Sequence, residues 1–197
     1  MRAHCNAAPH RAACYVCFKP QVACVCATIA PVANRTGIVI LQHPRERFHP
    51  VGTTRIARLG LHRVRVESCA PWTDADAIRA RLPQDAALLY PSPDAPDLAA
   101  LPIARRPRHL VLIDGTWFHA KKIYDAHAWL RALPQISLTP SRPSRYRVRR
   151  EPKPHCIGTL EAIVDALRIL EPETRGLNGL LRSFEAMVDR QASYTGL

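Results

Sequence analysis

The chain has 197 residues, 47% of them hydrophobic, which is enough for one well-packed domain and little more. Its 28 Lys and Arg residues outnumber 16 Asp and Glu residues, and the resulting formal charge of +12 favours a polyanionic partner. No apolar run reaches the roughly 20 residues of a membrane span, and residues 1–5 lack the apolar core of a signal peptide, so we expect a cytoplasmic protein without membrane contact.

Strand-like and helix-like segments alternate along the chain after a loose tail over residues 1–12. Strands are predicted over residues 36–41, 63–67, 86–90, 110–114 and 135–139. Helices are predicted over residues 53–61, 74–82, 117–133, 159–170 and 177–188, with Thr159 as the cap of the fourth. This alternation is typical of an α/β fold with a mainly parallel sheet flanked by helices.

Four of the seven cysteines form a cluster with the spacing Cys14-x2-Cys17-x6-Cys24-x1-Cys26. In a reducing compartment such a cluster indicates metal ligation rather than disulfides. Four thiolates suit a structural zinc ion with no open position for catalysis, although an iron–sulfur cluster uses the same ligands. We therefore predict a tail and zinc-binding arm over residues 1–34, followed by the main domain over residues 35–197.

The segment Asp114-Gly115-Thr116-Trp117 follows the apolar run of residues 110–113, where a buried strand should give way to a helix. In open α/β sheets, ligands bind at such junctions. An Asp at this position could also be only a helix cap, with Trp117 in the core. The junction is therefore the first candidate for a ligand-binding site.

Basic residues gather over residues 142–153, where Arg145, Arg147 and Arg149 would share one face of a strand. Such a face could neutralise several phosphates of an RNA, although a solvated edge strand has the same pattern. The predicted RNA-binding residues are Arg45, Lys121, Lys122, Arg142, Arg145, Arg147, Arg149 and Arg150.

Taken together and in order, these pieces resemble the DTW-domain family, whose characterised members are tRNA-uridine aminocarboxypropyltransferases. The matching pieces are the four clustered cysteines, residues 41–46, Tyr90-Pro91, residues 114–117 with 120–122, residues 144–147 with Arg149, and residues 159–162. Val16 departs from the family pattern, in which a basic residue often precedes the second cysteine.

The resemblance implies transfer of the 3-amino-3-carboxypropyl group from S-adenosylmethionine to N3 of a uridine in tRNA, with release of methylthioadenosine. The family is related to the SPOUT methyltransferases, which implies a SPOUT-like main domain with a knotted C-terminal cofactor site. Two alternatives are an S-adenosylmethionine-dependent enzyme that modifies ribosomal RNA and a non-catalytic zinc-containing RNA-binding protein. No obligate protein partner is expected, and a monomer is favoured over a dimer.

The reaction needs a base, because N3 of uridine carries a proton. Asp114 is the candidate base, or it anchors the amino group of the transferred chain by a charge-assisted hydrogen bond. Thr116 and Trp117 complete the predicted catalytic set, Thr116 as a substrate ligand or helix cap. Trp117 would stack on the uracil, wall off the cofactor or lie in the core.

S-adenosylmethionine is expected where the ends of the strands near residues 90 and 138 meet the helix that begins at Thr159. The free N–H groups at the start of that helix suit the cofactor carboxylate. The predicted cofactor-binding residues are Tyr90, Pro91, Ser92, Asp114, Gly115, Leu138, Tyr146, Thr159 and Glu161.

Overall fold

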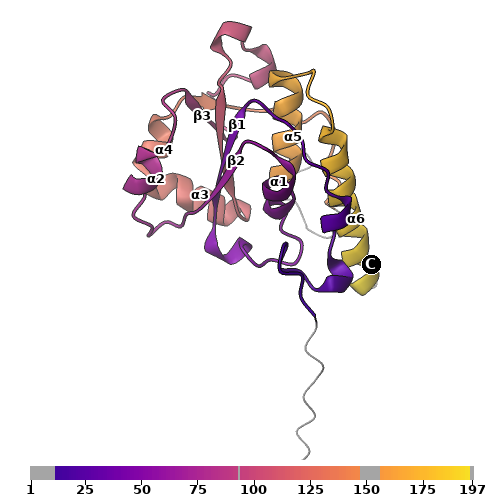
Figure 1. The fold of residues 1–197 in the computed structure, drawn as a ribbon. Coiled ribbons are helices and arrows are strands. Elements are labelled where there is room, and N and C mark those ends of the chain that lie inside the picture. The colour runs from indigo at the N-terminus through magenta and orange to yellow at the C-terminus, as the bar shows by residue number, and fades with distance from the viewer. Residues whose placement is uncertain (1–11, 93, 147–155, 196–197) are drawn as a thin grey trace, which may run out of the picture.

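The computed structural model describes residues 12–92, 94–146 and 156–195, built around a five-stranded sheet (Figure 1). The strands run in the order β2-β1-β4-β3-β5, and every neighbouring pair is parallel. Their bounds are β1 Gly37–Gln42, β2 Val64–Ser68, β3 Ala86–Leu89, β4 His109–Asp114 and β5 Gln135–Ile136. The predicted parallel α/β sheet is confirmed.

Helices cover both faces of the sheet (Figure 1). One face carries α1 (Thr54–Gly60), α5 (Thr159–Leu170) and α6 (Leu177–Thr195), and the other carries α2 (Asp76–Ala80), α3 (Trp117–Ala126) and α4 (Ala128–Ala132). Short 3₁₀ helices lie between them: η1 Gln21–Ala23, η2 Cys26–Thr28, η3 Pro44–Glu46, η4 Leu98–Ala100 and η5 Ile103–Arg105.

Alternating strand residues contribute side chains to two hydrophobic cores, because successive side chains of a strand point to opposite faces. In β4, Leu110 and Leu112 join the core under α1, α5 and α6, whereas Val111 joins the core under α2, α3 and α4. Strands buried on both faces read as continuous apolar runs. That is why the sequence alone located β1, β3 and β4 within a residue or two.

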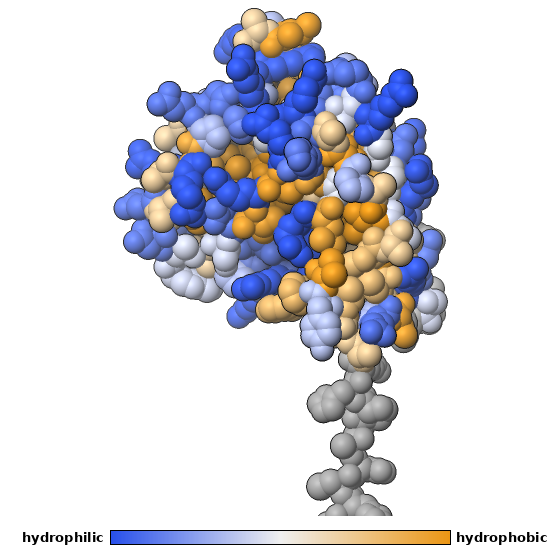
Figure 2. Space-filling view, viewed as in Figure 1, coloured by the Kyte–Doolittle hydropathy of each residue, from blue (hydrophilic) through white to orange (hydrophobic). Residues whose placement is uncertain are grey.

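Hydrophilic residues cover most of the face seen in Figure 2. An apolar patch interrupts them over β2 and between α1 and α6. β2 is one of the two edge strands, and its residues Val64 and Val66 are only partly buried against the core. In the described part of the chain, no helix is long and apolar enough to cross a membrane.

Three local predictions are wrong. The helix predicted over residues 117–133 is divided at His127, whose backbone is extended and whose Nε2 lies 2.9 Å from the Ala70 carbonyl oxygen. The last strand ends at Ile136, because Ser137 turns toward the segment before η4 and its N–H donates to Pro96. Gly158, not Thr159, is the N-cap of α5.

The predicted basic strand after residue 144 is not formed where the structure describes it. Arg145 and Tyr146 lie in irregular backbone, and the Tyr146 side chain is buried. Arg147, Arg149 and Arg150 lie outside the described residues. The knot that the family resemblance implies stays a prediction, since residues 147–155, which join Tyr146 to α5, also lie outside them.

Candidate active site and metal centre

A cavity of about 670 Å³ lies at the carboxyl ends of β3 and β4. Parallel sheets bind ligands at this edge, and the volume is typical of a small-molecule site. The segments that follow β1, β3, β4 and β5 all contribute to its wall, together with Tyr146 and the residues that precede and open α5. The cavity is therefore assembled from chain segments far apart in sequence.

Asp114 lies on the wall of this cavity and is 8% exposed. Gln42 Nε2 donates to its Oδ2 at 2.9 Å, and Thr159 Oγ1 donates to its Oδ1 at 2.6 Å. Because the two donors come from the end of β1 and the start of α5, the carboxylate joins three elements. Both of its oxygens are thus held in place at the end of β4.

Thr116 and Trp117 also line the cavity. Thr116 is the N-cap of α3, since its Oγ1 accepts a hydrogen bond of 3.2 Å from the N–H of His119. Of the two roles predicted for Thr116, capping is the one the structure displays. Trp117 is half-buried rather than enclosed in either core.

Most of the predicted cofactor-binding residues reach the cavity. Tyr90 stacks on Tyr124 with ring centroids 4.4 Å apart, and burial raises its pKa. Tyr146 packs edge-on against Phe184, and its hydroxyl donates to the Val51 carbonyl. The predicted residues that line the cavity are Tyr90, Pro91, Asp114, Gly115, Leu138, Tyr146 and Thr159.

Ser92 and Glu161 are the two predicted cofactor residues that the described lining does not include. The Glu161 carboxylate instead accepts hydrogen bonds from the N–H of Gly158 (2.8 Å), the N–H of Arg145 (2.9 Å) and Ser144 Oγ (2.7 Å). It therefore holds two wall segments together, the one ending at Tyr146 and the one starting α5.

Sequence reasoning missed part of the lining. Glu46, Gly52 and Thr53 reach the cavity from the segment after β1, and residues 156–158 reach it just before α5. Glu46 is 5% exposed, which is unusual for a carboxylate. Its position in the polar segment that follows a buried strand was a usable signal, because the carboxyl ends of parallel strands share one edge.

The described RNA-binding candidates lie at the surface. Lys121 Nζ pairs with Asp125 at 2.6 Å, and Lys122 Nζ lies 4.3 Å from the centroid of the Phe118 ring. Arg145 pairs with Glu185. The candidates with exposed side chains are Arg45, Lys121, Lys122, Arg142 and Arg145.

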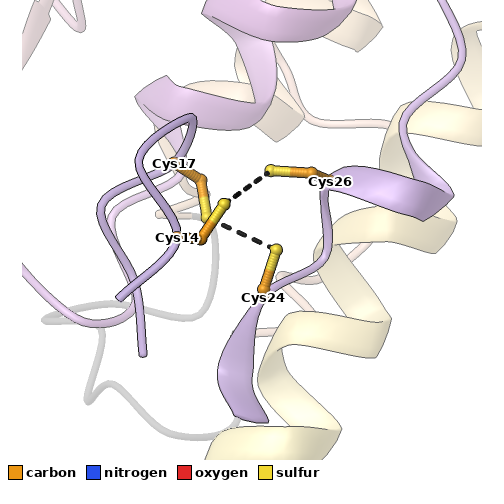
Figure 3. Close-up of side chains that lie close together, drawn as sticks. All are labelled: Cys14, Cys17, Cys24 and Cys26. Carbon is orange, nitrogen blue, oxygen red and sulfur yellow. Dashed lines mark hydrogen bonds between the residues drawn. The ribbon is translucent and has the colours of Figure 1, made fainter. Parts of the chain in front are cut away.

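The four clustered cysteines converge, as Figure 3 shows. Cys14 Sγ lies 3.8 Å from Cys26 Sγ, Cys17 Sγ lies 3.7 Å from Cys24 Sγ, and all four sulfurs lie within 4.8 Å of one another. A tetrahedron of zinc–sulfur bonds about 2.3 Å long separates its sulfurs by about 3.8 Å. The cluster thus fits one tetrahedral ion, whereas a multi-iron cluster distributes its cysteines over separate irons and needs more room.

Cationic groups surround the sulfur cluster. Lys19 is 1% exposed, its Nζ donates to the Pro50 carbonyl, and burial next to Arg55 lowers its pKa to about 8. Arg55 donates to the carbonyls of Cys17 and Arg47. Hydrogen bonds from the backbone lower the pKa of Cys14 to about 6. Burial instead raises the pKa of Cys17 and of Cys26, so their thiolates, the form that binds a metal, need the positive charge of a bound ion.

The sequence matches one described family over nearly its whole length. A family model described as the DTW domain matches residues 11–192. The tRNA-uridine aminocarboxypropyltransferase 2 of Drosophila melanogaster is 35% identical over 175 residues, which cover 82% of this chain and 68% of that protein.

Two further relatives carry related names. The tRNA-uridine aminocarboxypropyltransferase 2 of Mus musculus is 31% identical over 95% of this chain and 66% of its own length. The tRNA-uridine aminocarboxypropyltransferase A of Arabidopsis thaliana is 26% identical over 93% of this chain and 82% of its own length. The chain thus spans about two thirds of the fly and mouse relatives. No solved structure matches it.

Proposed function

Because this chain belongs to the DTW domain family, we propose that it is a tRNA-uridine aminocarboxypropyltransferase. The proposed reaction transfers the 3-amino-3-carboxypropyl group of S-adenosylmethionine to N3 of a uridine. The bond between the sulfonium sulfur and the methylene carbon breaks, and a bond from N3 to that carbon forms. Methylthioadenosine leaves, and the N3 proton passes to a base.

The observation that carries the proposal is the Asp114 carboxylate on the wall of a cavity of about 670 Å³. A carboxylate accepts about four hydrogen bonds, and Gln42 and Thr159 supply one to each oxygen. Each oxygen therefore keeps a lone pair for a ligand. We propose that Asp114 takes the N3 proton; its alternative role is to bind the amino group of the transferred chain.

The start of α5 is proposed to bind the cofactor carboxylate. Gly158 and Thr159 line the cavity, and α5 is a helix of 12 residues. The free N–H groups and the partial positive charge at a helix N-terminus favour an anion. The sulfonium methylene would then lie between this helix end and Asp114, where a uracil entering the cavity can reach it.

The RNA is proposed to bind through the exposed cations around the cavity. The formal charge of +12 favours a polyanion, and Arg45, Arg142 and Lys122 are exposed. Each phosphate neutralised makes binding weaker as salt increases. A tRNA therefore supplies the charge and the uridine that this site needs.

The test is a reaction of purified protein with S-adenosylmethionine and unmodified tRNA, followed by mass spectrometry of the nucleosides. We expect a uridine heavier by one aminocarboxypropyl group, together with methylthioadenosine. Asp114→Asn should lower kcat by roughly 100-fold or more. Asp125→Asn, which changes an exposed carboxylate on α3, is the matched control and should keep the activity.

Each result of this experiment has a definite meaning. If Asp114→Asn lowers kcat but still binds S-adenosylmethionine in calorimetry, Asp114 is the base; if the affinity for the cofactor falls, it is the anchor. A methylated nucleoside, or no modified nucleoside from wild-type protein, would contradict the proposed reaction.

A further inference from the structure

Four aromatic rings form a row across the carboxyl ends of β2, β1 and β4. Trp72 follows β2, His43 follows β1, and Phe118 and His119 lie in the first turn of α3. The Trp72 and His43 centroids are 6.1 Å apart, edge to face, and His43 stacks on His119 at 4.0 Å with an interplanar angle of 4°. His119 then lies 5.8 Å from Phe118.

The two ends of this ring row are exposed, whereas in its middle His43 is buried and His119 is half-buried. Trp72 is 76% exposed and Phe118 is 64% exposed, but His43 is only 2% exposed. Phe118 also lines the cavity that holds Asp114. Large aromatic side chains usually bury most of their surface. Two of them exposed beside a candidate active site therefore point to a ligand with flat, stackable groups.

The middle of the ring row is held rigidly by its surroundings. A Cβ atom placed on Gly115 would lie 3.1 Å from the Cβ of His119 and 3.5 Å from the Cβ of His43, so both histidines pack closely against this glycine. His43 Nδ1 also accepts a hydrogen bond of 3.3 Å from the N–H of Arg45. Rigid supports lower the entropy cost of binding a partner.

Cations accompany the exposed rings. Lys122 Nζ lies 4.3 Å from the Phe118 centroid, and the exposed Arg45 follows His43 by two residues. Aromatic rings interleaved with cations are the usual means by which proteins hold single-stranded nucleic acid, because rings stack on bases and cations pair with phosphates.

We propose that Trp72 and Phe118 are stacking platforms for unpaired RNA bases that flank the target uridine, with Lys122 and Arg45 binding their phosphates. This inference rests on the proposed function and specifies how the same site holds its RNA. N3 of a paired uridine is inaccessible, so the target base must leave its stack. Its neighbours then lose a stacking partner, which the two exposed rings replace.

The test measures binding of a fluorescently labelled, uridine-rich, single-stranded oligoribonucleotide, and of its duplex, by anisotropy. Trp72→Ala and Phe118→Ala should each weaken single-strand binding roughly tenfold, the order expected for one stacked base, and affect the duplex less. The affinity for S-adenosylmethionine should stay unchanged in calorimetry for Trp72→Ala, because Trp72 is not part of the described cavity wall.

Two further variants distinguish the loss of a stacking ring from the loss of the fold and from the loss of any exposed apolar side chain. Trp72→Phe keeps a ring and should keep the affinity within a few-fold, while it removes the Trp72 fluorescence that a stacked base quenches. Ile103→Ala is the matched control, because Ile103 is 82% exposed. It lies on η5, which precedes β4 and so lies at the amino ends of the strands, near the top of Figure 1. It should bind RNA like wild type.

Unchanged affinity for the single strand in both alanine variants would contradict the proposed stacking. An equal loss of affinity in Ile103→Ala would contradict it as well. The result is independent of catalysis. If wild type binds the single strand through Trp72 and Phe118 yet modifies no uridine, the proposed function fails and the platforms stand. If wild type modifies tRNA and the alanine variants keep its KM for tRNA, the stacking proposal is contradicted and the proposed function stands.

Discussion

The cysteine arm and the Asp114 cavity are held together by different forces. Among the described arm residues 12–34, the buried hydrophobic residues are Cys17, Val25 and Val32, and the helices of the arm are all short 3₁₀ helices. The cavity stands on parallel strands whose side chains fill two hydrophobic cores. We expect a segment with so little apolar burial to gain its order from a bound metal, whereas the cavity gains its order from the sheet.

The segment of residues 46–53 links the two regions. Lys19, in the arm, donates to the Pro50 carbonyl, and Tyr146, in the cavity wall, donates to the Val51 carbonyl. Gly52 and Thr53 line the cavity directly. The arm therefore supports one wall of the cavity, although its own stability has a separate origin.

Removing the metal should have the largest effect and should most clearly separate the behaviour of the cysteine arm from that of the cavity region. Chelation is expected to release one ion per chain, expose the four arm thiols to a thiol reagent and open residues 12–31 to proteolysis, while the sheet stays protected. The reason is that four ligands hold the arm and two cores hold the sheet. Metal analysis, thiol labelling and limited proteolysis measure these changes.

Two cysteine variants control this experiment. Cys17→Ser should lose the metal, whereas Cys69→Ser should keep it, because Cys69 is buried beside His127, away from the cluster. Protein that carries no metal, or an arm that stays protected after chelation, would show that the arm is held by packing.

Glu161→Gln should have the next largest effect, confined to the cavity. The amide offers one acceptor oxygen where the carboxylate accepts from Gly158, Arg145 and Ser144. We expect a loss of about 1–3 kcal/mol in the free energy of unfolding, weaker cofactor binding and unchanged metal content. Denaturant unfolding and calorimetry measure the two losses.

Glu185→Gln is the control for Glu161→Gln, because Glu185 pairs with Arg145 near the surface without touching the cavity wall. Such a pair contributes less than about 1 kcal/mol. Equal effects of the two substitutions on cofactor binding would contradict the assigned role of Glu161.

The smallest expected effect is on the pH dependence of the free energy of unfolding. It arises at His43, which packs against Gly115 in the cavity wall. Burial, with His119 and Arg45 nearby, lowers the pKa of His43 below its ordinary value of 6.5. The unfolded chain then binds a proton at pH values where the folded chain does not. The free energy of unfolding should therefore fall as the pH drops from 6.5 through the folded-state pKa.

His43→Asn tests this assignment, since the Asn side chain can still accept a hydrogen bond from Arg45 but does not titrate. Denaturant unfolding at a series of pH values should give a flatter curve for the variant than for wild type. Parallel curves would mean that other groups cause the loss.

The periodicity of the sequence located most of the fold for a physical reason. β1, β3 and β4 are buried on both faces, so their apolar runs stand out, and close cysteine pairs can converge on one ion without knowledge of the sheet. Sequence patterns failed to predict local structure where a contact with a residue far away in the sequence determines it. Thr159 has the composition of a cap, but its hydroxyl donates to Asp114, and Gly158 takes the cap position.

The sequence by itself determined the order of strands and helices, the cluster of four cysteines and the family resemblance, because each depends on spacing along the chain. Only the tertiary structure decided which side chains meet: Gln42 and Thr159 on Asp114, and the ring row from Trp72 to Phe118. These contacts depend on the strand order β2-β1-β4-β3-β5. Periodicity does not encode that order, since any pairing of the same strands would bury the same apolar residues.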